Sequence, residues 1–388
     1  MKRGPGIGNR GSLLRHAAGS LLVVGLNGPQ LSGLERAWLR LVRPGGIILF
    51  KRNIVDAAQA RALLDEATGF CVPYAVRCVD VEGGTVNRLR DALAPLPSAQ
   101  AVGVVVKKSK KPGWAREHGE LIARAVKAFG FNTTLAPVVD LALPESTEVL
   151  GSRPPGANAA DVVTYARAFL EGLTKHGIVG CGKHFPGLGG ATGDTHFVTP
   201  EIERDWKQLW SEDVVPYREL HAAMPMVMMN HAAYPEAPSK NVPASASAFW
   251  ITKVLRKRIG YRGIILSDDL EMGGILKFLP VDEAAIEAVR AGSDLLEICH
   301  SAELILRSYE ALVSEAERSS AFRTLLLARS REVAGKQKRL YAVDVGRALT
   351  EKQLLALKDR ILRFGERIAA HAKDDVIVPR AISPAETS

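Results

Sequence analysis

The sequence predicts an α/β protein that folds as a single (β/α)8 barrel of the TIM type with additional C-terminal helices. One observation is that eight short apolar runs, each bounded by turn residues, alternate with segments of helical periodicity from residue 21 to residue 299. The other is that polar residues follow these runs directly, where a barrel displays its functional groups. Eight repeats favour a closed parallel barrel over an open, doubly wound sheet.

The expected elements follow in chain order. The strands are predicted at Leu21–Leu26, Gly46–Phe50, Tyr74–Asp80, Asn132–Asp140, Ile178–His184, Met226–His231, Ile264–Asp268 and Asp294–Cys299. Amphipathic helices are expected between them at Ala57–Thr68, Trp114–Phe129, Ala160–His176 and Val281–Ala291. Longer helical periodicity over Ala302–Ala328 and Leu349–His371 follows the last strand. We therefore expect an N-terminal extension over 1–19, a catalytic barrel over 20–300, and C-terminal helices packed on the barrel with a flexible tail over 301–388.

Composition and charge limit the classes of partner. The chain has 388 residues, 47% of them hydrophobic, which is ordinary for a globular enzyme with a large core. Its formal net charge is +9, and its basic clusters lie within 107–111 and 256–258. No nucleic-acid-binding motif accompanies these clusters, so we interpret them as solvated faces and expect no nucleic-acid partner.

Cysteine usage and hydropathy predict a cytoplasmic protein. The four cysteines are scattered inside apolar runs with no Cys-x-x-Cys pair, which is typical of reduced core residues and not of a metal site. The basic N-terminus and the run Leu21–Leu26 resemble a signal peptide, but the run is too short for its apolar region. No stretch approaches the apolar length of a membrane span. We expect no membrane partner, no metal and no cofactor.

A glycine-rich loop, Cys181–His196, is the most informative stretch of the chain. It reads Cys-Gly-Lys-His-Phe-Pro-Gly-Leu-Gly-Gly-Ala-Thr-Gly-Asp-Thr-His and carries Lys183, His184, Asp194 and His196. So much glycine and proline excludes a helix interior, and its polar groups can converge on a ligand. A solvated turn would explain any one histidine, but it explains the four residues together poorly.

Polar residues also follow the other expected strands. Asp80 and Glu82 follow the third, Asp140 and Arg153 the fourth, Lys183 and His184 the fifth, His231 the sixth, and Asp268 and Asp269 the seventh. In a (β/α)8 barrel these carboxyl ends form one rim, so residues far apart in sequence can face one pocket. Helix capping is the alternative explanation for the aspartates. It explains Lys183, His184 and His231 poorly.

Five segments carry a family resemblance, in this order: Gly45-Gly-Ile-Ile-Leu-Phe-Lys-Arg-Asn53, Asp80-Val-Glu-Gly-Gly-Thr-Val-Asn-Arg88, Leu135-Ala-Pro-Val-Val-Asp140, Lys183-His-Phe-Pro-Gly187 and Leu266-Ser-Asp-Asp-Leu270. Over roughly residues 20 to 300 the chain resembles the β-N-acetylhexosaminidases of glycoside hydrolase family 3, single-barrel enzymes of bacterial cell-wall recycling. The resemblance implies a retaining exo-β-N-acetylglucosaminidase that removes terminal N-acetylglucosamine from peptidoglycan-derived fragments.

The resemblance also implies the catalytic residues. Asp268 corresponds to the attacking aspartate, which forms a covalent glycosyl-enzyme intermediate. Asp194 and His196 correspond to an acid/base pair in which the aspartate holds the histidine. Asp269 is expected to point away from the pocket, because neighbouring strand residues face opposite sides.

Sugar binding is implied for five residues: Asp80, Arg88, Arg153, Lys183 and His184. Glu82 and His231 are expected to support the pocket from behind. The chain departs from the family pattern at Leu188, where the family usually has histidine, and at Thr195, where serine is commoner. Leu188 removes a polar group near the site, which puts loop closure, substrate preference or turnover in doubt.

Two alternatives to hydrolysis stay open. A β-N-acetylglucosaminide phosphorylase could use the same residues, because a histidine acid/base would not repel a phosphate anion. A catalytically impaired sugar-binding homologue is the second alternative. The expected partner is a carbohydrate, an N-acetylglucosamine-containing muropeptide. The sequence leaves its aglycone and the oligomeric state open, with a monomer favoured.

Overall fold

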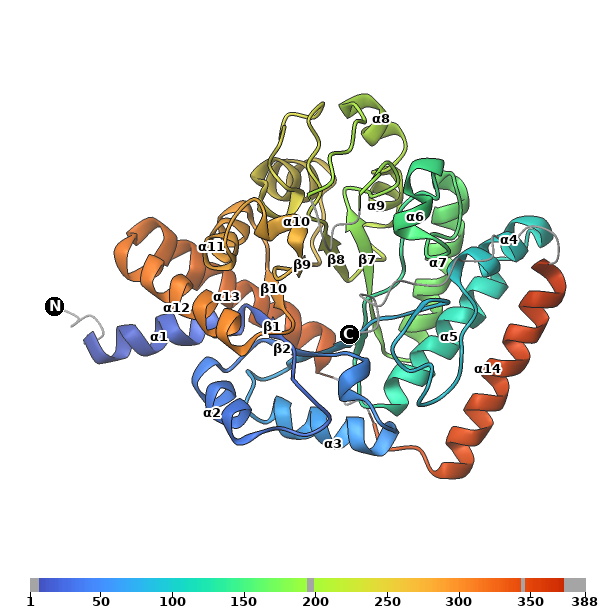
Figure 1. Cartoon of the computed structure of the whole chain (residues 1–388), viewed down its shortest axis with the longest axis horizontal. Coiled ribbons are helices and arrows are strands. Elements are labelled where there is room, and N and C mark those ends of the chain that lie inside the picture. Colours follow the sequence, from blue (N-terminus) through green and yellow to red (C-terminus); the bar gives the residue numbers. More distant parts are fainter. Residues whose placement is uncertain (1–6, 194–198, 343–345, 373–388) are drawn as a thin grey trace.

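The computed structural model describes residues 7–193, 199–342 and 346–372. Eight parallel strands close into a barrel in the order β1-β10-β9-β8-β7-β6-β3-β2, with helices around it (Figure 1). This architecture confirms the predicted (β/α)8 barrel. Its strands are β1 (Leu22–Val24), β2 (Gly46–Leu49), β3 (Val76–Val79), β6 (Thr133–Thr134), β7 (Val179–Phe185), β8 (Met226–Met229), β9 (Ile264–Asp269) and β10 (Leu295–Ile298).

Each expected apolar run overlaps one barrel strand, but the fourth is much shorter than predicted. Only Thr133–Thr134 of the expected Asn132–Asp140 pairs as a strand. Pro137 interrupts the run, and proline has no amide hydrogen to donate to a neighbouring strand. Beyond it, Val138 makes only an isolated bridge to Lys183. The chain from 135 to 140 therefore continues along β7 without a regular ladder.

The four helices expected between strands are present. They are α3 (Ala57–Thr68), α5 (Gly113–Ala128), α7 (Ala159–Lys175) and α11 (Val281–Ala291). The structure adds elements that were not expected: α2 (Gly33–Val42), α4 (Ala99–Ser109), α6 (Thr147–Leu150), α8 (Trp206–Ser211), α9 (Val215–Leu220), α10 (Gly273–Leu276), a π-helix over Phe249–Arg258, and single 3-10 turns at Lys51–Asn53, Pro144–Ser146 and Ala244–Ala246. A separate antiparallel hairpin joins β4 (Val81–Gly83) to β5 (Val86–Asn87). It carries the chain from Asp80 to Arg88 across the mouth of the barrel.

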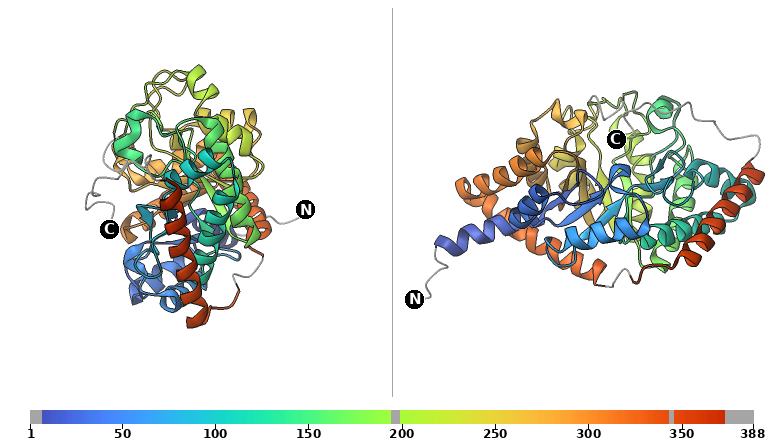
Figure 2. Two further views of the ribbon diagram at one scale, coloured as in Figure 1. Left: turned by 90° about the vertical axis from the view of Figure 1, so that its right-hand side faces the viewer. Right: turned by 60° about the horizontal axis from the view of Figure 1, so that its bottom comes forward.

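The terminal helices lie on two sides of the barrel. Helices α1 (Ile7–Ser20), α12 (Ala302–Arg318) and α13 (Ser320–Tyr341) pack together on one side. Helix α14 (Glu351–Ala372) packs on α4 and α5 on the other side, as the views of Figure 2 also show. The predicted division into an extension, a barrel and C-terminal helices stays a prediction.

The single helix expected over Ala302–Ala328 is wrong, because the chain breaks at Ser319. Ser319 is extended, with φ −110° and ψ 114°, and its side chain accepts a hydrogen bond from Phe322 N as the N-cap of α13. A serine in this position satisfies one of the unpaired amides at the start of a helix. Two helices separated by one residue therefore replace one continuous helix.

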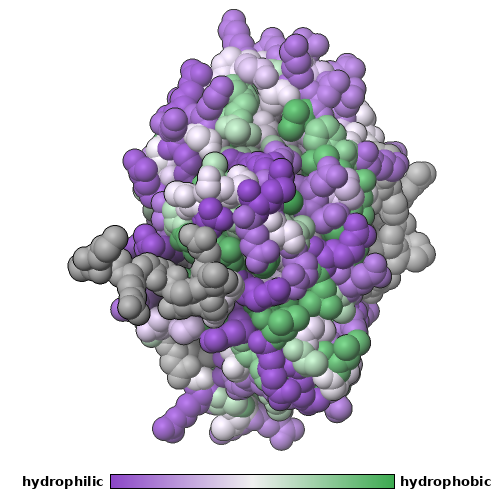
Figure 3. Space-filling view, turned by 90° about the vertical axis from the view of Figure 1, so that its left-hand side faces the viewer, coloured by the Kyte–Doolittle hydropathy of each residue, from purple (hydrophilic) through white to green (hydrophobic). Residues whose placement is uncertain are grey.

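The outer surface is mixed in character. Figure 3 shows the side of the molecule that carries α1 and α12, where hydrophilic side chains divide the apolar areas. Leu13 of α1 is one of the apolar side chains exposed there, at 46%. Scattered exposed apolar residues of this kind are normal on a globular protein. In the described part of the chain, no helix is long and apolar enough to cross a membrane.

Candidate active site

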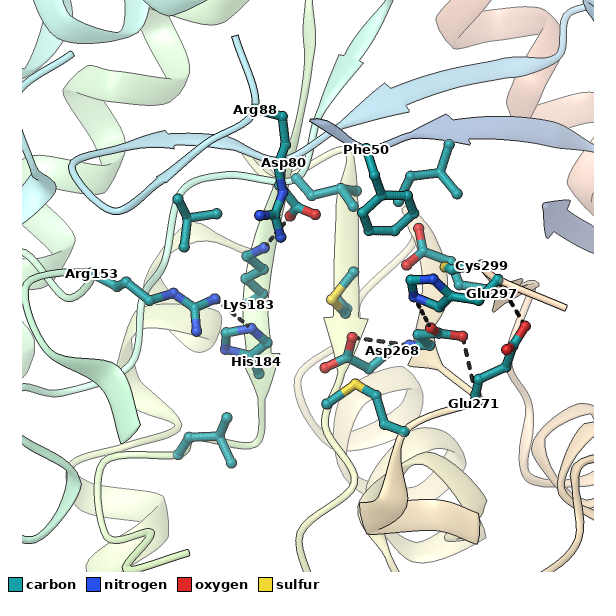
Figure 4. A pocket seen from close by; sticks show the side chains of 18 of the residues that line it. Phe50, Asp80, Arg88, Arg153, Lys183, His184, Asp268, Glu271, Glu297 and Cys299 are labelled. Carbon is teal, nitrogen blue, oxygen red and sulfur yellow. Dashed lines mark hydrogen bonds and ion pairs between the residues drawn. The ribbon is translucent and has the colours of Figure 1, made fainter. Parts of the chain in front are cut away.

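A pocket of about 230 Å³ lies at the carboxyl ends of the barrel strands (Figure 4). It brings together the predicted nucleophile Asp268 and the five residues expected to bind sugar, namely Asp80, Arg88, Arg153, Lys183 and His184. These six residues come from four different parts of the barrel rim. The predicted convergence on one pocket is therefore present in the structure, while the role of each residue stays a prediction.

One side of the pocket is an ion-pair network centred on Glu82. Lys183 Nζ lies 2.7 Å from Asp80 Oδ1 and 2.7 Å from Glu82 Oε1. Arg153 donates to both Glu82 oxygens, from Nε at 2.9 Å and from Nη2 at 3.0 Å. Burial alone would raise the pKa of Glu82, but Arg153 and Lys183 outweigh burial and lower it to about 2. Glu82 is thus an anion that does not line the pocket but fixes two cations that do.

A second buried carboxylate, Asp140, positions the end of β7 and the loop that follows it. Asp140 Oδ2 lies 2.7 Å from His184 Nδ1, and its oxygens also accept from the His184 amide at 3.2 Å. Leu188 N donates to Asp140 Oδ1 at 2.8 Å. On the far side of the ring, His184 Nε2 lies 3.2 Å from Arg153 Nη2. Asp140 and Arg153 therefore fix the orientation of the imidazole from both of its nitrogens.

Leu188, the departure from the family pattern, lines the pocket and is 2% exposed. Its side chain belongs to the apolar core, whereas its backbone amide is bound to Asp140. The structure thus gives this position a packing contact and a backbone contact. No polar side-chain contact to a sugar can come from it.

Asp268 lies at the carboxyl end of β9 and faces the pocket. Its Oδ1 accepts a hydrogen bond from Asp269 N at 3.0 Å. Burial would raise the pKa of Asp268, but electrostatic interactions with His184, His231 and Lys183 lower it below its ordinary value. The pocket therefore holds Asp268 as a carboxylate, the form that can attack an electrophilic carbon.

The expectation that Asp269 points away from the pocket is wrong. Asp269 also lines it, and its Oδ2 lies 3.4 Å from His300 Nε2. The cause is an irregularity in the pairing of β9 with β10, where Leu295 pairs with Leu266 but Glu297 pairs with Asp269. Two steps along β10 thus correspond to three along β9. Such a bulge breaks the strict alternation of strand side chains and lets both aspartates reach one cavity.

The residues expected behind the pocket lie there. His231 is fully buried, and its ring nitrogens lie 2.7 Å from Ser245 Oγ and 3.0 Å from Asp269 O. Burial lowers the pKa of His231. His231 and Glu82 thus contact groups that line the pocket without lining it themselves. Their supporting roles stay predictions.

The predicted acid/base residues Asp194 and His196 lie outside the described residues. The described residues on either side of this gap include Leu188 and Thr199. Leu188 lines the pocket itself, and Thr199 Oγ1 donates to Gly274 O at 2.6 Å, in the helix that follows Asp268.

Several pocket residues were not expected from the sequence. Phe50, Glu271, Glu297 and Cys299 line the wall opposite Lys183 and His184 (Figure 4). His300 also lines the pocket. The Phe50 ring lies 5.1 Å from the His300 ring and 5.8 Å from the Arg88 guanidinium. Glu271 accepts from the amides of His300 and Ser301 at 2.9 Å, which joins the loop after β9 to the end of β10.

One of these residues had a sequence signal. Glu297 is a charged residue inside the apolar run Asp294–Cys299, at a position that an interior strand would fill with an apolar side chain. Among the described residues, no group of three His, Cys, Asp or Glu side chains is arranged to hold a metal ion.

Comparison with known families gives a match to the glycosyl hydrolase family 3 N-terminal domain over residues 13–329. The chain belongs to this family. It is 35% identical to the beta-hexosaminidase of Methylococcus capsulatus over 77% of this chain and 89% of that protein. It is 36% identical to the beta-hexosaminidase of Neisseria meningitidis serogroup A over 69% of this chain and 74% of that protein.

Solved structures agree with this assignment. NagZ from Neisseria gonorrhoeae, in complex with N-trifluoroacetyl-D-glucosamine, has a TM-score of 0.74 at 28% identity, covering 91% of this chain and 98% of that chain. A family 3 beta-N-acetylglucosaminidase from Paenibacillus has a TM-score of 0.81 at 30% identity, and the match covers 90% of this chain and 68% of that chain. The family resemblance predicted from the sequence is confirmed, and the chain is a glycoside hydrolase.

Proposed function

We propose that this glycoside hydrolase is a retaining exo-β-N-acetylglucosaminidase that uses Asp268 as its nucleophile. The observation that carries the proposal is an ionised aspartate facing a set of fixed donors, Lys183, Arg153 and His184, in one small pocket. A volume of about 230 Å³ is below the usual range of ligand pockets, which is about 300–1,000 Å³. A pocket of this size suits one terminal sugar better than the middle of a chain.

The reaction then follows the two-step retaining mechanism. The Asp268 carboxylate attacks the anomeric carbon, the bond to the leaving oxygen breaks, and a glycosyl-Asp268 ester forms. His196, held by Asp194, gives its proton to the leaving oxygen and then takes a proton from the water that cleaves the ester. Proton transfer of this kind contributes about 10²–10⁴-fold to the rate.

Sugar recognition is assigned to the network on the other side of the pocket. Glu82 and Asp140 hold Arg153, Lys183 and His184 in place before a ligand arrives. Charged donors and acceptors fixed in this way make directional hydrogen bonds to sugar hydroxyls. Asp80, paired with Lys183, and Arg88, beside Phe50, supply further polar contacts at the mouth.

The natural substrate that we propose is a peptidoglycan-derived fragment that ends in β-linked N-acetylglucosamine, hydrolysed in the cytoplasm. The resemblance to enzymes of bacterial cell-wall recycling supports this substrate. Incubating the enzyme with an N-acetylglucosaminyl-anhydromuramyl peptide should release free N-acetylglucosamine, detected by mass spectrometry. An unchanged fragment, together with hydrolysis of small aryl substrates, would rule out this aglycone.

The experiment that tests the activity uses 4-nitrophenyl β-glycosides with and without phosphate. We expect release of 4-nitrophenol from the N-acetylglucosaminide, little release from the glucoside, and loss of activity in Asp268→Asn. Asp359→Asn on α14, far along the chain and half exposed, is the matched control and should keep full activity. Equal rates on both sugars would overturn the substrate assignment, and a sugar 1-phosphate formed only with phosphate would reveal a phosphorylase.

A further inference from the structure

The wall of the pocket formed by β10 contains an acid that the proposed mechanism does not use. Glu297 is 2% exposed and lines the pocket. In Figure 4 it lies beside Cys299, on the opposite side from Lys183 and His184. Its amide donates to Ser267 Oγ at 3.0 Å, in the strand that carries Asp268. The backbone of Glu297 is therefore fixed against β9, next to the predicted nucleophile.

The Glu297 carboxyl group differs from the other buried acids in its partners. Glu82 is paired with two cations, and Asp294 is paired with Arg256, Arg329 and Lys336. The one side-chain partner of Glu297 in the described part of the chain is the Cys78 thiol, 3.9 Å from Oε1. No described cation pairs with Glu297. Its Oε2 has no hydrogen-bond partner among the described residues.

The surroundings of Glu297 favour a neutral acid over a carboxylate. Burial, followed by the negative charges of Asp80, Asp268 and Asp269, raises the pKa of Glu297 well above its ordinary value, and Lys183 opposes this only in part. The titratable and charged groups that face it are Cys78 in β3, Asp80 directly after β3, Cys181 and Lys183 in β7, Asp268 and Asp269 in β9, and Cys299 after β10. A protonated carboxyl has one O–H donor, which a carboxylate lacks.

We propose that Glu297 is a substrate-binding residue whose neutral carboxylic acid donates a hydrogen bond to a hydroxyl oxygen of the sugar held against Asp268. The inference rests on the proposed function and names a specificity-determining residue within the same site. A neutral donor suits this place. A further carboxylate beside Asp80, Asp268 and Asp269 would repel all three, and it could only accept hydrogen bonds from the sugar.

Two substitutions of Glu297 separate a neutral donor from an ionised acceptor. Glu297→Gln keeps a neutral group that can donate, and Glu297→Leu removes the donor with an apolar side chain of similar size. On 4-nitrophenyl β-N-acetylglucosaminide we expect kcat/KM within about threefold of wild type for glutamine, and a loss of about tenfold or more for leucine. Glu310→Leu, an exposed acid on α12, is the control and should leave kcat/KM unchanged.

Deoxy substrates test the contact itself. The substrates are the 3-, 4- and 6-deoxy analogues, each of which lacks one sugar hydroxyl. We expect that one of them lowers kcat/KM of the wild-type enzyme about as much as Glu297→Leu does. The same analogue should cause no further loss in the leucine variant, because the contact is already absent there. In addition, wild-type kcat/KM should fall as rising pH ionises Glu297, whose pKa is raised in the folded enzyme, and Glu297→Gln should lack this fall. Both readouts report on a substrate contact, which a purely structural side chain would not affect.

Three results would overturn the inference. The first is a leucine variant as active as wild type, and the second is a glutamine variant as impaired as the leucine variant. The third is that, for every deoxy sugar, the loss from the missing hydroxyl adds in full to the loss from Glu297→Leu. Should the leucine variant fail to fold, the glutamine variant and the deoxy series on wild type decide. If the wild-type enzyme hydrolyses no β-N-acetylglucosaminide, the proposed function is refuted, but the proposed contact of Glu297 with the sugar is not. Calorimetry of N-acetylglucosamine binding to wild type and Glu297→Leu then tests the contact, with equal affinities contradicting it.

Discussion

Replacing Glu82 by glutamine should lower the free energy of unfolding by about 3 kcal/mol at pH 7, because this buried anion balances two cations. Arg153 and Lys183 overcome the effect of burial and lower the pKa of Glu82 from 4.5 to about 2. A pKa unit corresponds to about 1.36 kcal/mol, which gives about 3 kcal/mol for the ionised form. Removing one partner of a buried ion pair costs about 3–5 kcal/mol in general, which agrees with this value.

The assay is urea unfolding of wild type and Glu82→Gln over a range of pH. The pKa of Glu82 is lowered in the folded state, so its contribution is fully present above about pH 4.5 and is lost as the pH falls toward 2. The difference between the two proteins should shrink across that window. Glu310→Gln, which removes an exposed acid paired with Arg15, is the matched control and should change stability by about 1 kcal/mol or less.

Two results would refute this reasoning. One is a loss below about 1 kcal/mol at pH 7, and the other is a difference between wild type and Glu82→Gln that does not change between pH 5 and pH 2. Either would mean that Glu82 is not the ionised centre of the network that holds Lys183 and Arg153.

Two further predictions concern positioning and stability. Asp140→Asn should lower kcat/KM by about 100-fold, measured by steady-state kinetics. The amide NH2 cannot accept a hydrogen bond, so it would face the donors of His184 and Leu188 and disturb their positions. Unchanged activity would contradict this reasoning. Ser319→Ala should lower the free energy of unfolding by about 1 kcal/mol, measured by urea unfolding, because α13 loses its N-cap. The control is Ser320→Ala at the exposed neighbouring position, which should have no effect. Equal losses in the two variants would exclude the cap as the cause.

Much of the barrel was predictable because its signals are local. Apolar runs separated by amphipathic segments can be counted along the chain, and each of the eight predicted runs overlaps a barrel strand. Helix α2 was missed although its signal is present, since Ser32 and Glu35 have the spacing of a capping box and form one in the structure. This omission was therefore avoidable from sequence.

Two other features leave no signal in the apolar periodicity of a single segment. The break at Ser319 contains neither glycine nor proline, so the periodicity runs through it unchanged. The inward turn of Asp269 depends on its register with β10, some thirty residues away along the chain. A single strand pattern contains no information about a bulge that its partner imposes.

The candidate site was predicted in part. The rim argument and the family resemblance together named six of the residues that line the pocket. Five of these lie in the segments that carry the resemblance, and the assignment of Arg153, thirteen residues beyond Asp140, came from the resemblance alone. The role of Asp140 as acceptor for both His184 and Leu188 was missed, since hydrogen-bond partners depend on side-chain orientation. Glu297 was passed over as part of an apolar strand, although an acid in such a run has to find a partner or lose its charge.

Locating the covalent intermediate tests the central claim most directly. The enzyme would be incubated with a fluorinated β-N-acetylglucosaminyl fluoride, whose glycosyl-enzyme ester is hydrolysed slowly, then digested and analysed by tandem mass spectrometry. We predict that the anomeric fluoride leaves and that one fluorinated N-acetylglucosaminyl group is added to the peptide that contains Ile264–Asp269, assigned to Asp268 and absent from Asp268→Asn. An adduct on Asp269 or on any other residue, or turnover with no adduct at all, would contradict the assignment of Asp268 as the nucleophile.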